Sequence, residues 1–321
     1  MAVTLGFAGD TMLGRGVGEV LAGAGTTELW SPALRDLAGS ADLVLVNLEC
    51  CISNRGQHWP DPDKAFFFRA PPVATLPLRQ LGVRCVNLAN NHALDYGRDA
   101  LGDTFDHLAA AGIDWVGAGQ DATRAWEPRV FTVGGLRVGV LGIADYPPEY
   151  AAGPETSGIA HVDLRSGVPD WLTDRVAALR ARVDSVVITP HWGPNMVTEP
   201  LDYVRAAAEA LLAAGATLVA GHSAHVFHGV YRTVLFDLGD LVDDYAVNPR
   251  LRNDLGLFWL VTLDADGPIS VHAVPLRLGY AHTELATGQD AQWVRDRFRQ
   301  ACEQLGTPVD QRDGELIVHL R

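Results

Sequence analysis

Cysteine is scarce in this sequence, which contains four in 321 residues, two of them adjacent at Cys50 and Cys51. So few thiols cannot form the disulfide framework of a small secreted protein. A thiolate metal site would need partners that the other two cysteines do not obviously provide. Cys50 and Cys51 are therefore expected to be small buried residues rather than metal ligands.

Basic residues are also few, since 25 Lys and Arg stand against 39 Asp and Glu and give a formal net charge of −14. This charge argues against non-specific attraction to nucleic acid or anionic lipid, so no nucleic-acid partner is expected. An anionic substrate would have to be bound by local basic side chains.

Long apolar runs are missing as well. Stretches such as LFWLVTL at 257–263 fall far short of the roughly 20 residues that a membrane-spanning helix needs. The stretch MAVTLGFAGD at 1–10 has no basic n-region, no long apolar h-region and no small-residue cleavage site. We expect no membrane span, and the cytoplasm is the expected compartment.

What the sequence does contain is 48% apolar residues, enough for a large core. Apolar, β-branched runs alternate with amphipathic patterns. The expected strands are 3–8, 42–46, 83–88, 114–117, 185–189, 216–220 and 232–238. The expected helices are 99–111, 170–183 and 199–214, with Gly112 and Gly215 at C-terminal cap positions.

Two further patterns predict antiparallel pairs. Gly134-Gly135 lies between alternating runs and predicts a hairpin over 128–143. A second pair is expected at 257–263 and 269–275, turned by Asp266-Gly267-Pro268. The predicted class is α/β with a mixed, two-sheet core. The Pro- and Gly-rich segments 53–72 and 145–169 fit no clear element and are candidate walls of a substrate cleft.

Polar side chains follow the ends of the predicted strands. They are Asp10, Asn47, Glu49, Asn90, Asn91, His92, His191, His222, His225 and Asp240. In an open α/β sheet, ligands bind outside the carboxyl ends of the strands, so these groups can converge. Imidazole, carboxylate and amide oxygen together suit Zn²⁺, Mn²⁺ or Fe. A carboxylate such as Glu49 can bridge two ions, and this arrangement indicates metal-assisted hydrolysis.

Several of these residues also have a purely structural interpretation. Asp10 can cap a helix or a turn after Gly9. His222 and His225 can form a polar helix face, and the amide pair can form a turn. Such a turn would leave the imidazole of His92 unexplained.

The order of the motifs resembles a known family. GDTMLGRG at 9–16, NLE at 47–49, LANNHALDYG at 88–97, GAG at 117–119, HWG at 191–193, GHSAH at 221–225 and FDLGDLV at 236–242 look like the successive motifs of the CapA family. These bacterial capsule and poly-γ-glutamate synthesis proteins, also called PgsA, belong to the calcineurin-like metallophosphatase superfamily.

The resemblance implies a four-layer α-β-β-α sandwich with mixed sheets and a dinuclear metal centre. The whole of 1–321 would form one domain, with the motifs in about 3–245 and with C-terminal strands and a helix in 255–321 completing the fold.

The resemblance also implies roles for single residues. Asp10 would bind the first metal together with His225, and Glu49 would bridge. Asn91, His191 and His222 would bind the second metal. His92 would protonate the leaving group or stabilise the transition state, so His92, Asp10 and Glu49 form the candidate catalytic set.

The sequence departs from the family pattern at several positions. Met12 stands where phosphoesterases have a His ligand, and Glu49 replaces the usual Asp. Ser223-Ala224 replaces His-Pro, and Asp240 replaces an Asn. If Asp240 reaches the site, its charge favours metal binding and disfavours an anionic substrate.

Substrate contacts are predicted from Arg15, Arg69, Asn47, Trp192 and Asp240. A guanidinium matches a carboxylate or phosphate, although a surface salt bridge is an equal alternative for both arginines. Trp192 is either a pocket wall or a core residue.

Two functions of different class remain open. The first is a metal-dependent hydrolase, phosphoesterase- or amidase-like, that uses one or two Mn, Zn or Fe ions and a metal-activated water to cleave an anionic phosphate ester or a γ-glutamyl amide. The second is a non-catalytic subunit of poly-γ-glutamate or capsule synthesis or export machinery. The sequence leaves the oligomeric state open.

Overall fold

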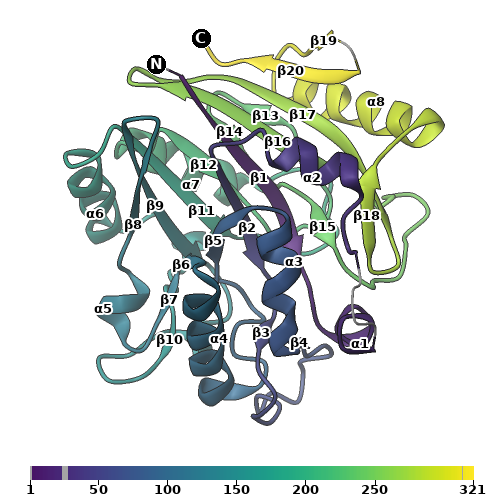
Figure 1. Ribbon diagram of the computed structural model, residues 1–321. Coiled ribbons are helices and arrows are strands. Elements are labelled where there is room, and N and C mark those ends of the chain that lie inside the picture. Colours follow the sequence, from purple (N-terminus) through teal and green to yellow (C-terminus); the bar gives the residue numbers. More distant parts are fainter. Residues whose placement is uncertain (1, 24–27, 313) are drawn as a thin grey trace.

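Two mixed β-sheets form the centre of the protein in the computed structural model (Figure 1), which describes residues 2–23, 28–312 and 314–321. Within these residues the larger sheet has ten strands. Its main order is β19(Asp310–Arg312), β20(Glu315–His319), β17(Gly267–Gly279), β16(Leu255–Asp264), β1(Val3–Thr11), β2(Leu43–Leu48), β5(Val83–Asn87) and β6(Asp114–Val116). Strand β15(Asp240–Val242) pairs with β1, and β18(His282–Leu285) pairs with β17.

The smaller sheet has the order β13(Val230–Tyr231), β14(Val234–Leu235), β12(Leu218–Ala220), β11(Ser185–His191), β9(Leu136–Ala144) and β8(Arg129–Val133). Two short pairs lie apart from both sheets. They are β3(Cys51–Ile52) with β4(Arg69–Ala70), and β7(Ala118–Gly119) with β10(Gly158–Ile159).

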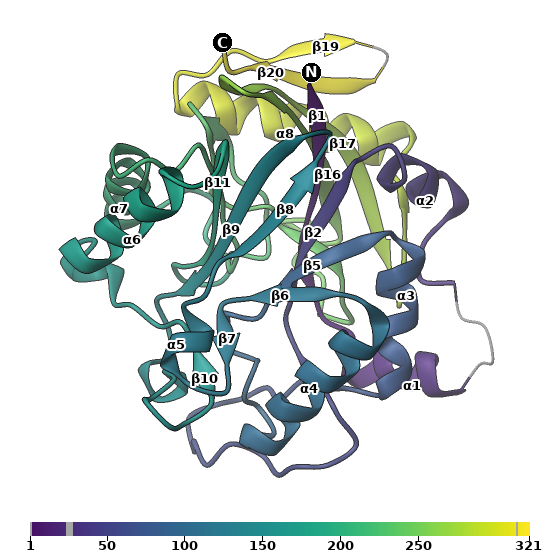
Figure 2. The same ribbon diagram turned by 60° about the vertical axis from the view of Figure 1, so that its left-hand side comes forward.

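The inner faces of the two sheets pack on each other through apolar side chains such as Phe7, Val140 and Val187. Helices cover both outer faces (Figure 2). The larger sheet is covered by α1(Arg15–Gly23), α2(Pro32–Ala38), α3(Thr75–Gln80) and α4(Gly97–Ala111). The smaller sheet is covered by α6(Asp170–Arg180) and α7(Asp202–Ala213).

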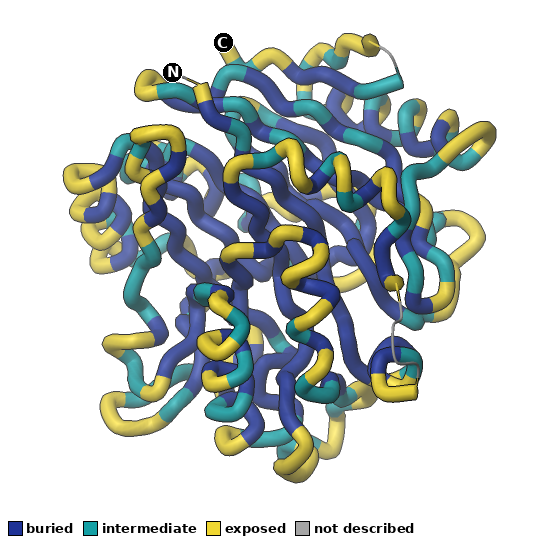
Figure 3. The backbone as a smooth tube through the Cα atoms, viewed as in Figure 1, coloured by how far each residue is buried: buried dark blue, intermediate teal, exposed yellow. Residues whose placement is uncertain are grey.

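One helix departs from this layering. Helix α8(Gly288–Gln304) places Val294, Phe298 and Cys302 in the same core cluster as the inner faces of the sheets. Helix α8 therefore lies beside the smaller sheet and does not cover its outer face. The remaining helical segments are short: α5(Ala122–Ala125), η1(Pro72–Ala74), η2(Pro148–Tyr150) and η3(Leu164–Ser166). The exposed residues lie mainly on the helices and loops around a buried centre (Figure 3).

The mixed α/β class predicted from the sequence is confirmed by this architecture. Both expected antiparallel pairs form, as β8 with β9 and as β16 with β17. Gly112 ends α4 in the left-handed region at φ 70°, where a residue with a side chain would be strained. Gly215, also at positive φ, directly follows the C-cap of α7.

Some expected boundaries are wrong. The strand expected at 232–238 is instead a tight hairpin of β13 and β14, because Arg232 turns the chain at φ 51°. Helix α7 begins at Asp202, not at residue 199, because the residue before Pro200 is disfavoured in helical geometry. The segments 53–72 and 145–169 contain β4, β10 and the short helical turns η2 and η3, and η1 begins at the end of the first segment.

Parallel pairing decides where the site forms. Strands β1, β2, β5 and β6 are parallel neighbours, as are β9, β11, β12 and β14. Their carboxyl ends therefore meet at common edges. In addition, β15 runs parallel to β1 and places Asp240 in register with Asp10.

Candidate metal centre

The carboxylates of the site come from the larger sheet and the imidazoles from the smaller one. Asp10 is in β1, Glu49 directly follows β2, and Asp240 begins β15. His191 ends β11, and His222 and His225 follow β12. All six side chains are at least nine-tenths buried, so the structure brings residues from distant parts of the chain into one enclosed cluster.

Asp10 lies at the middle of the cluster. Its Oδ1 is 3.3 Å from Nδ1 of His222, and its Oδ2 is 3.3 Å from Nδ1 of His225. The backbone N–H of Ser223 also donates to Oδ2, over 3.3 Å. The Asp10 carboxylate thus contacts the chain segment that carries two of the three histidines.

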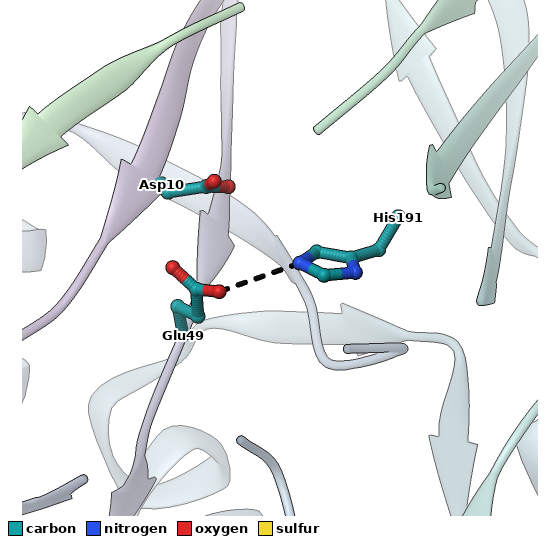
Figure 4. Close-up of side chains that lie close together, drawn as sticks. All are labelled: Asp10, Glu49 and His191. Carbon is teal, nitrogen blue, oxygen red and sulfur yellow. Dashed lines mark hydrogen bonds and ion pairs between the residues drawn. The ribbon is translucent and has the colours of Figure 1, made fainter. Parts of the chain in front are cut away.

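Glu49 faces the third histidine (Figure 4), with 3.3 Å between its Oε1 and Nε2 of His191. Its Oε2 is 3.9 Å from Nδ1 of His225 and is buried without a hydrogen-bond partner. On the other side of the cluster, Asp240 Oδ1 lies 2.9 Å from Nδ1 of His225, while Asp240 Oδ2 is also buried and unpartnered.

Two overlapping triads have the compactness of a metal site. The first is Asp10, Glu49 and His191, and the second is Asp10, His225 and Asp240. In each triad the possible ligand atoms lie within 4.8 Å of one another. Because Asp10 is common to both, its carboxylate could contact two neighbouring ions.

The loop after β12 holds the histidines in unusual backbone geometry. Ser223 has φ 114° and His225 has φ 58°, conformations that residues with side chains rarely adopt. The Asp237 carboxylate stabilises this loop by accepting from the backbone N–H of Ala224 over 2.7 Å. Backbone strain of this kind is often found at functional sites.

A buried network of amide side chains holds Asp10 in position. Nδ2 of Asn47 donates to Asp10 Oδ1 over 2.7 Å, and Oδ1 of Asn47 accepts from Asn87 and Asn90. Asn90 also donates to the backbone of Leu48 and accepts from the backbone of His92. Asn47, predicted as a substrate contact, is fully buried, and its side chain is turned toward Asp10.

Asn91 and His92 face different surroundings. Oδ1 of Asn91 is buried and has no hydrogen-bond partner. The His92 ring stacks on Phe68 at 4.0 Å, and its Nδ1 lies 2.6 Å from Oδ2 of Asp95. In the neutral ring, Nδ1–H donates to Asp95, which leaves Nε2 as the free acceptor.

The charges in the cluster strongly influence one another. Burial and the neighbouring Asp10 raise the pKa of Glu49, and burial together with Asp243 and Asp10 raises the pKa of Asp240. Burial acts to raise the pKa of Asp10, but interactions with His222, His225 and His191 outweigh it and lower the pKa. So many acidic groups in one buried space favour a bound cation.

The pKa values of the imidazoles shift in different directions. Burial lowers the pKa of His191 to about 4 and also lowers the pKa of His222, so both rings are neutral near pH 7. Burial acts in the same direction on His225, but the negative charges of Glu49, Asp10 and their neighbours raise its pKa overall. Neutral imidazole is the form that binds metal ions.

Met12 does not contribute to the cluster. Its Sδ accepts from the backbone N–H of Gly14 over 3.1 Å, within its own turn, and its side chain is fully buried. Asp240 lies in the second triad, so a carboxylate from β15 is available where Met12 supplies no ligand.

A cavity of about 170 Å³ opens beside Asn91 and His92. Lys64 and Asp63 line it from segment 53–72, and Glu149 lines it from segment 145–169. Both segments therefore form walls of one cleft, as their composition predicts.

The side chains of the three remaining substrate-contact predictions already have partners within the protein. Arg15 forms an ion pair with Asp244, 3.0 Å from Nη2 to Oδ1. Arg69 stacks over Tyr96 at 4.1 Å and donates to the backbone of Arg55. Trp192 is buried in the core between the smaller sheet and its helices, where its indole N–H donates to Phe236. Both arginines are already paired, and Trp192 occupies a core position.

The cysteines are buried thiols, and burial raises the pKa of Cys50 to about 12. They therefore stay protonated near neutral pH and offer no thiolate to a metal ion.

Sequence reasoning missed one important group of contacts. Asp95 accepts from the Tyr150 hydroxyl over 3.1 Å and from the backbone of Phe68 over 2.6 Å, and it pairs with Lys64 over 3.0 Å. Asp95 lies within the LANNHALDYG stretch. Its partners come from two loops, 27 residues or more away along the chain, without a periodic pattern that would link them.

Comparisons with known proteins agree on one family. The family described as "Bacterial capsule synthesis protein PGA_cap" matches residues 4–245. A "probable polyglutamine synthesis accessory protein" of Mycobacterium tuberculosis is 30% identical, over 98% of this chain and 95% of that protein. The "PGA biosynthesis protein CapA" of Bacillus subtilis is 30% identical, over 74% of this chain and 62% of that protein.

Among solved structures, a hypothetical protein from Thermus thermophilus has a similar fold, with a TM-score of 0.50. The two share 14% sequence identity, and the match covers 85% of this chain and 99% of that one. Among the described residues, no helix combines the length and the apolar character required to cross a membrane.

Proposed function

Because this chain belongs to the bacterial capsule synthesis protein family PGA_cap, we propose that it is a metal-dependent hydrolase of a phosphate ester or a γ-glutamyl amide. The relatives are named for capsule and polyglutamine synthesis, and this proposal gives the chain a hydrolytic step in such a process. The observation that carries it is the enclosed cluster of Asp10, Glu49, Asp240 and three histidines.

Unpartnered ligand atoms support a metal in this cluster. Buried polar atoms almost always have a hydrogen-bond partner. Yet Oε2 of Glu49, Oδ1 of Asn91, Nδ1 of His222 and Oδ2 of Asp240 are all buried without one. All four belong to the candidate ligand set, so a bound cation would satisfy them together.

The donor atoms indicate which ions fit. Carboxylate oxygen, amide oxygen and imidazole nitrogen suit Mn²⁺, Zn²⁺ and Fe. Asp10, His225 and Asp240 would hold one ion. Glu49, His191, His222 and Asn91 would hold a second. We include Asp240 as a ligand because it belongs to a compact triad and one of its two carboxylate oxygens is buried without a partner.

The chain's own groups suit hydrolysis at this place. A divalent ion bound there would lower the pKa of a water molecule and polarise the scissile group. Burial lowers the pKa of His92 to about 4, so its ring is neutral at rest and Asp95 fixes its orientation. Nε2 of His92 is then the atom that exchanges a proton with substrate, and a ring protonated on both nitrogens would donate it to the leaving group.

Metal analysis combined with two assays tests this function. The purified protein is analysed for metals and then assayed with p-nitrophenyl phosphate and γ-glutamyl p-nitroanilide, with Mn²⁺, Zn²⁺ or Fe²⁺ added. We expect at least one ion per chain and hydrolysis of one substrate. We also expect both to fall in Asp240→Asn but not in the control Asp244→Asn, which affects the ion pair with Arg15.

The second function is a non-catalytic subunit of polymer synthesis or export machinery. Met12 in place of a ligand and the word "accessory" in the name of the mycobacterial relative favour it. Protein that binds none of the three ions and is inert toward both substrates would contradict the hydrolase and leave this alternative.

A further inference from the structure

The cavity beside His92 is lined by more acidic than basic side chains, although the names of the relatives refer to capsule synthesis. Among its lining residues, Asp61, Asp63 and Glu149 are acidic, and Lys64 is the basic one. The cavity therefore presents an excess of negative charge beside a site for which anionic substrates are expected.

The positive charge of Lys64 is already compensated. Its Nζ lies 3.0 Å from Oδ1 of Asp95 and donates to the backbone oxygen of Asn91 over 2.7 Å. The side chain of Asp95 is fully buried, and that of Lys64 is 12% exposed. Because Lys64 is held by a buried carboxylate, it has little capacity to attract a second anion.

Two of the acidic side chains of the lining, Asp63 and Glu149, have no such partner. No hydrogen bond or ion pair is made by the carboxylates of Asp63 and Glu149 with any residue that the structure describes. They come from different segments of the chain, Asp63 from segment 53–72 and Glu149 from segment 145–169. A cation in the cavity would therefore find an unpaired carboxylate on each of the two segments that line it.

Two further features indicate that a ligand occupies this cavity. His92 lines it and is 6% exposed, and with Nδ1 on Asp95 its Nε2 has no partner among the described residues. The wall also carries an exposed aromatic side chain, Tyr146 at 53%. Aromatic faces attract ammonium groups and repel anions.

We propose that this cavity binds a protonated amine on the substrate, placed between Asp63 and Glu149 while the scissile group lies at His92 and the metal cluster. The inference rests on the proposed hydrolase function and narrows its substrate. The substrate is then a γ-glutamyl amide or phosphate ester whose other part is cationic, and a uniformly polyanionic chain is disfavoured.

Three matched dipeptides test the charge preference by equilibrium binding. Each of the three carries the α-ammonium of its γ-glutamyl residue. γ-Glutamyl-lysine adds an ε-ammonium on the second residue, γ-glutamyl-norleucine has the same carbon chain without this second ammonium, and γ-glutamyl-glutamate has a carboxylate in its place. Isothermal titration calorimetry with the metal-loaded protein should give about five- to tenfold tighter binding of the lysine peptide than of the norleucine peptide. This advantage should shrink as salt is raised.

Two variants test whether the preference for the lysine peptide arises from the cavity. In the double variant Asp63→Asn with Glu149→Gln, the lysine and norleucine peptides should bind equally. The control Glu303→Gln, an exposed residue of α8, should retain the full preference.

Binding and turnover separate the two proposals. Preferential binding of the lysine peptide without hydrolysis of any peptide would support the amine site and contradict a γ-glutamyl hydrolase. Hydrolysis of the lysine and norleucine peptides with equal kcat/KM and equal affinity would support the hydrolase and overturn the amine site. Tightest binding of the glutamate peptide, or no binding of any of the three, would also overturn it.

Discussion

Asn91 and His92 are neighbours in the chain, but their side chains have different surroundings. The orphaned oxygen of Asn91 belongs to the candidate ligand set, whereas His92 is held by Asp95 and lines the cavity. Their substitution should therefore affect different steps.

Asn91→Ala is expected to lower the metal content of the purified protein, because it removes a ligand oxygen. His92→Ala should leave the metal content unchanged and lower turnover by roughly 10²- to 10⁴-fold, the range of a positioned general acid or base. Elemental analysis and kcat on the same preparations check this. Equal metal loss in both variants would contradict the division of roles.

His228, outside the site, gives a prediction for acid stability. Its Nε2–H donates to the backbone of Val197 over 2.9 Å, and burial, assisted by the nearby Arg297 and Arg205, lowers its pKa to about 4. The unfolded chain binds this proton near pH 6.5 and the folded chain only near pH 4, so folding stability is lost as the pH falls through this window.

His228→Gln should remove that loss, which amounts to about 3 kcal/mol of unfolding free energy between pH 6.5 and pH 4. Denaturant unfolding of both proteins across this range measures it. The same substitution at the exposed His319 serves as the control and should leave the slope unchanged. A variant that loses stability as steeply as the parent would exclude His228 as the cause.

At the scale of elements, the close approach of β1 to the segment before β15 sets the spacing of the carboxylates. A Cβ on Gly9 would lie within 1.7 Å of the backbone oxygen of Gly239, the oxygen that accepts from the N–H of Asp10. The pairing of Asp10 with Asp240 in register therefore requires glycine at position 9.

Gly9→Ala should force these segments apart and destabilise the protein by several kcal/mol, in the range of severe overpacking. Gly102→Ala is the matched control, because it lies within α4 with open space at its Cβ and should raise stability by about 0.5–1 kcal/mol. Thermal unfolding distinguishes the two. Normal stability of Gly9→Ala would mean that the contact relaxes easily.

The two loops that line the cleft are connected through one residue. Asp95 contacts Lys64 and Phe68 of one loop and Tyr150 of the other, so a single buried carboxylate connects both walls to His92. The cleft is therefore built around the same motif that supplies the candidate catalytic histidine.

At the scale of the whole molecule, the candidate metal centre joins the two sheets. Asp10, Glu49 and Asp240 belong to the larger sheet, and His191, His222 and His225 to the smaller one. An ion held between them would stabilise the folded protein as a whole by mass action.

Chelation should therefore lower the Tm of the purified protein by roughly 5 °C, as expected for a ligand well above its dissociation constant. The double variant Asp10→Asn with His191→Ala should melt at the same temperature with and without EDTA. Differential scanning calorimetry measures both. If the Tm of the parent protein changes neither with EDTA nor with added Mn²⁺, no metal ion links the two sheets.

The sequence by itself determined the α/β class, the two antiparallel pairs and the position of polar residues at strand ends. Hydrophobic periodicity, glycine turns and family motifs are local or ordered signals, so they can be read along the chain. Asp10, His191 and Asp240 are therefore recognisable as candidates from the sequence.

Only the tertiary structure decided which of these groups meet and which are used elsewhere. Parallel pairing of β1 with β15 brought Asp240 to Asp10, whereas Arg15 pairs with Asp244 and Arg69 stacks over Tyr96. Lys64, Asp95 and Tyr150 came together from separate segments. The charge of a cleft depends on such long-range pairings, which no local pattern in the sequence specifies.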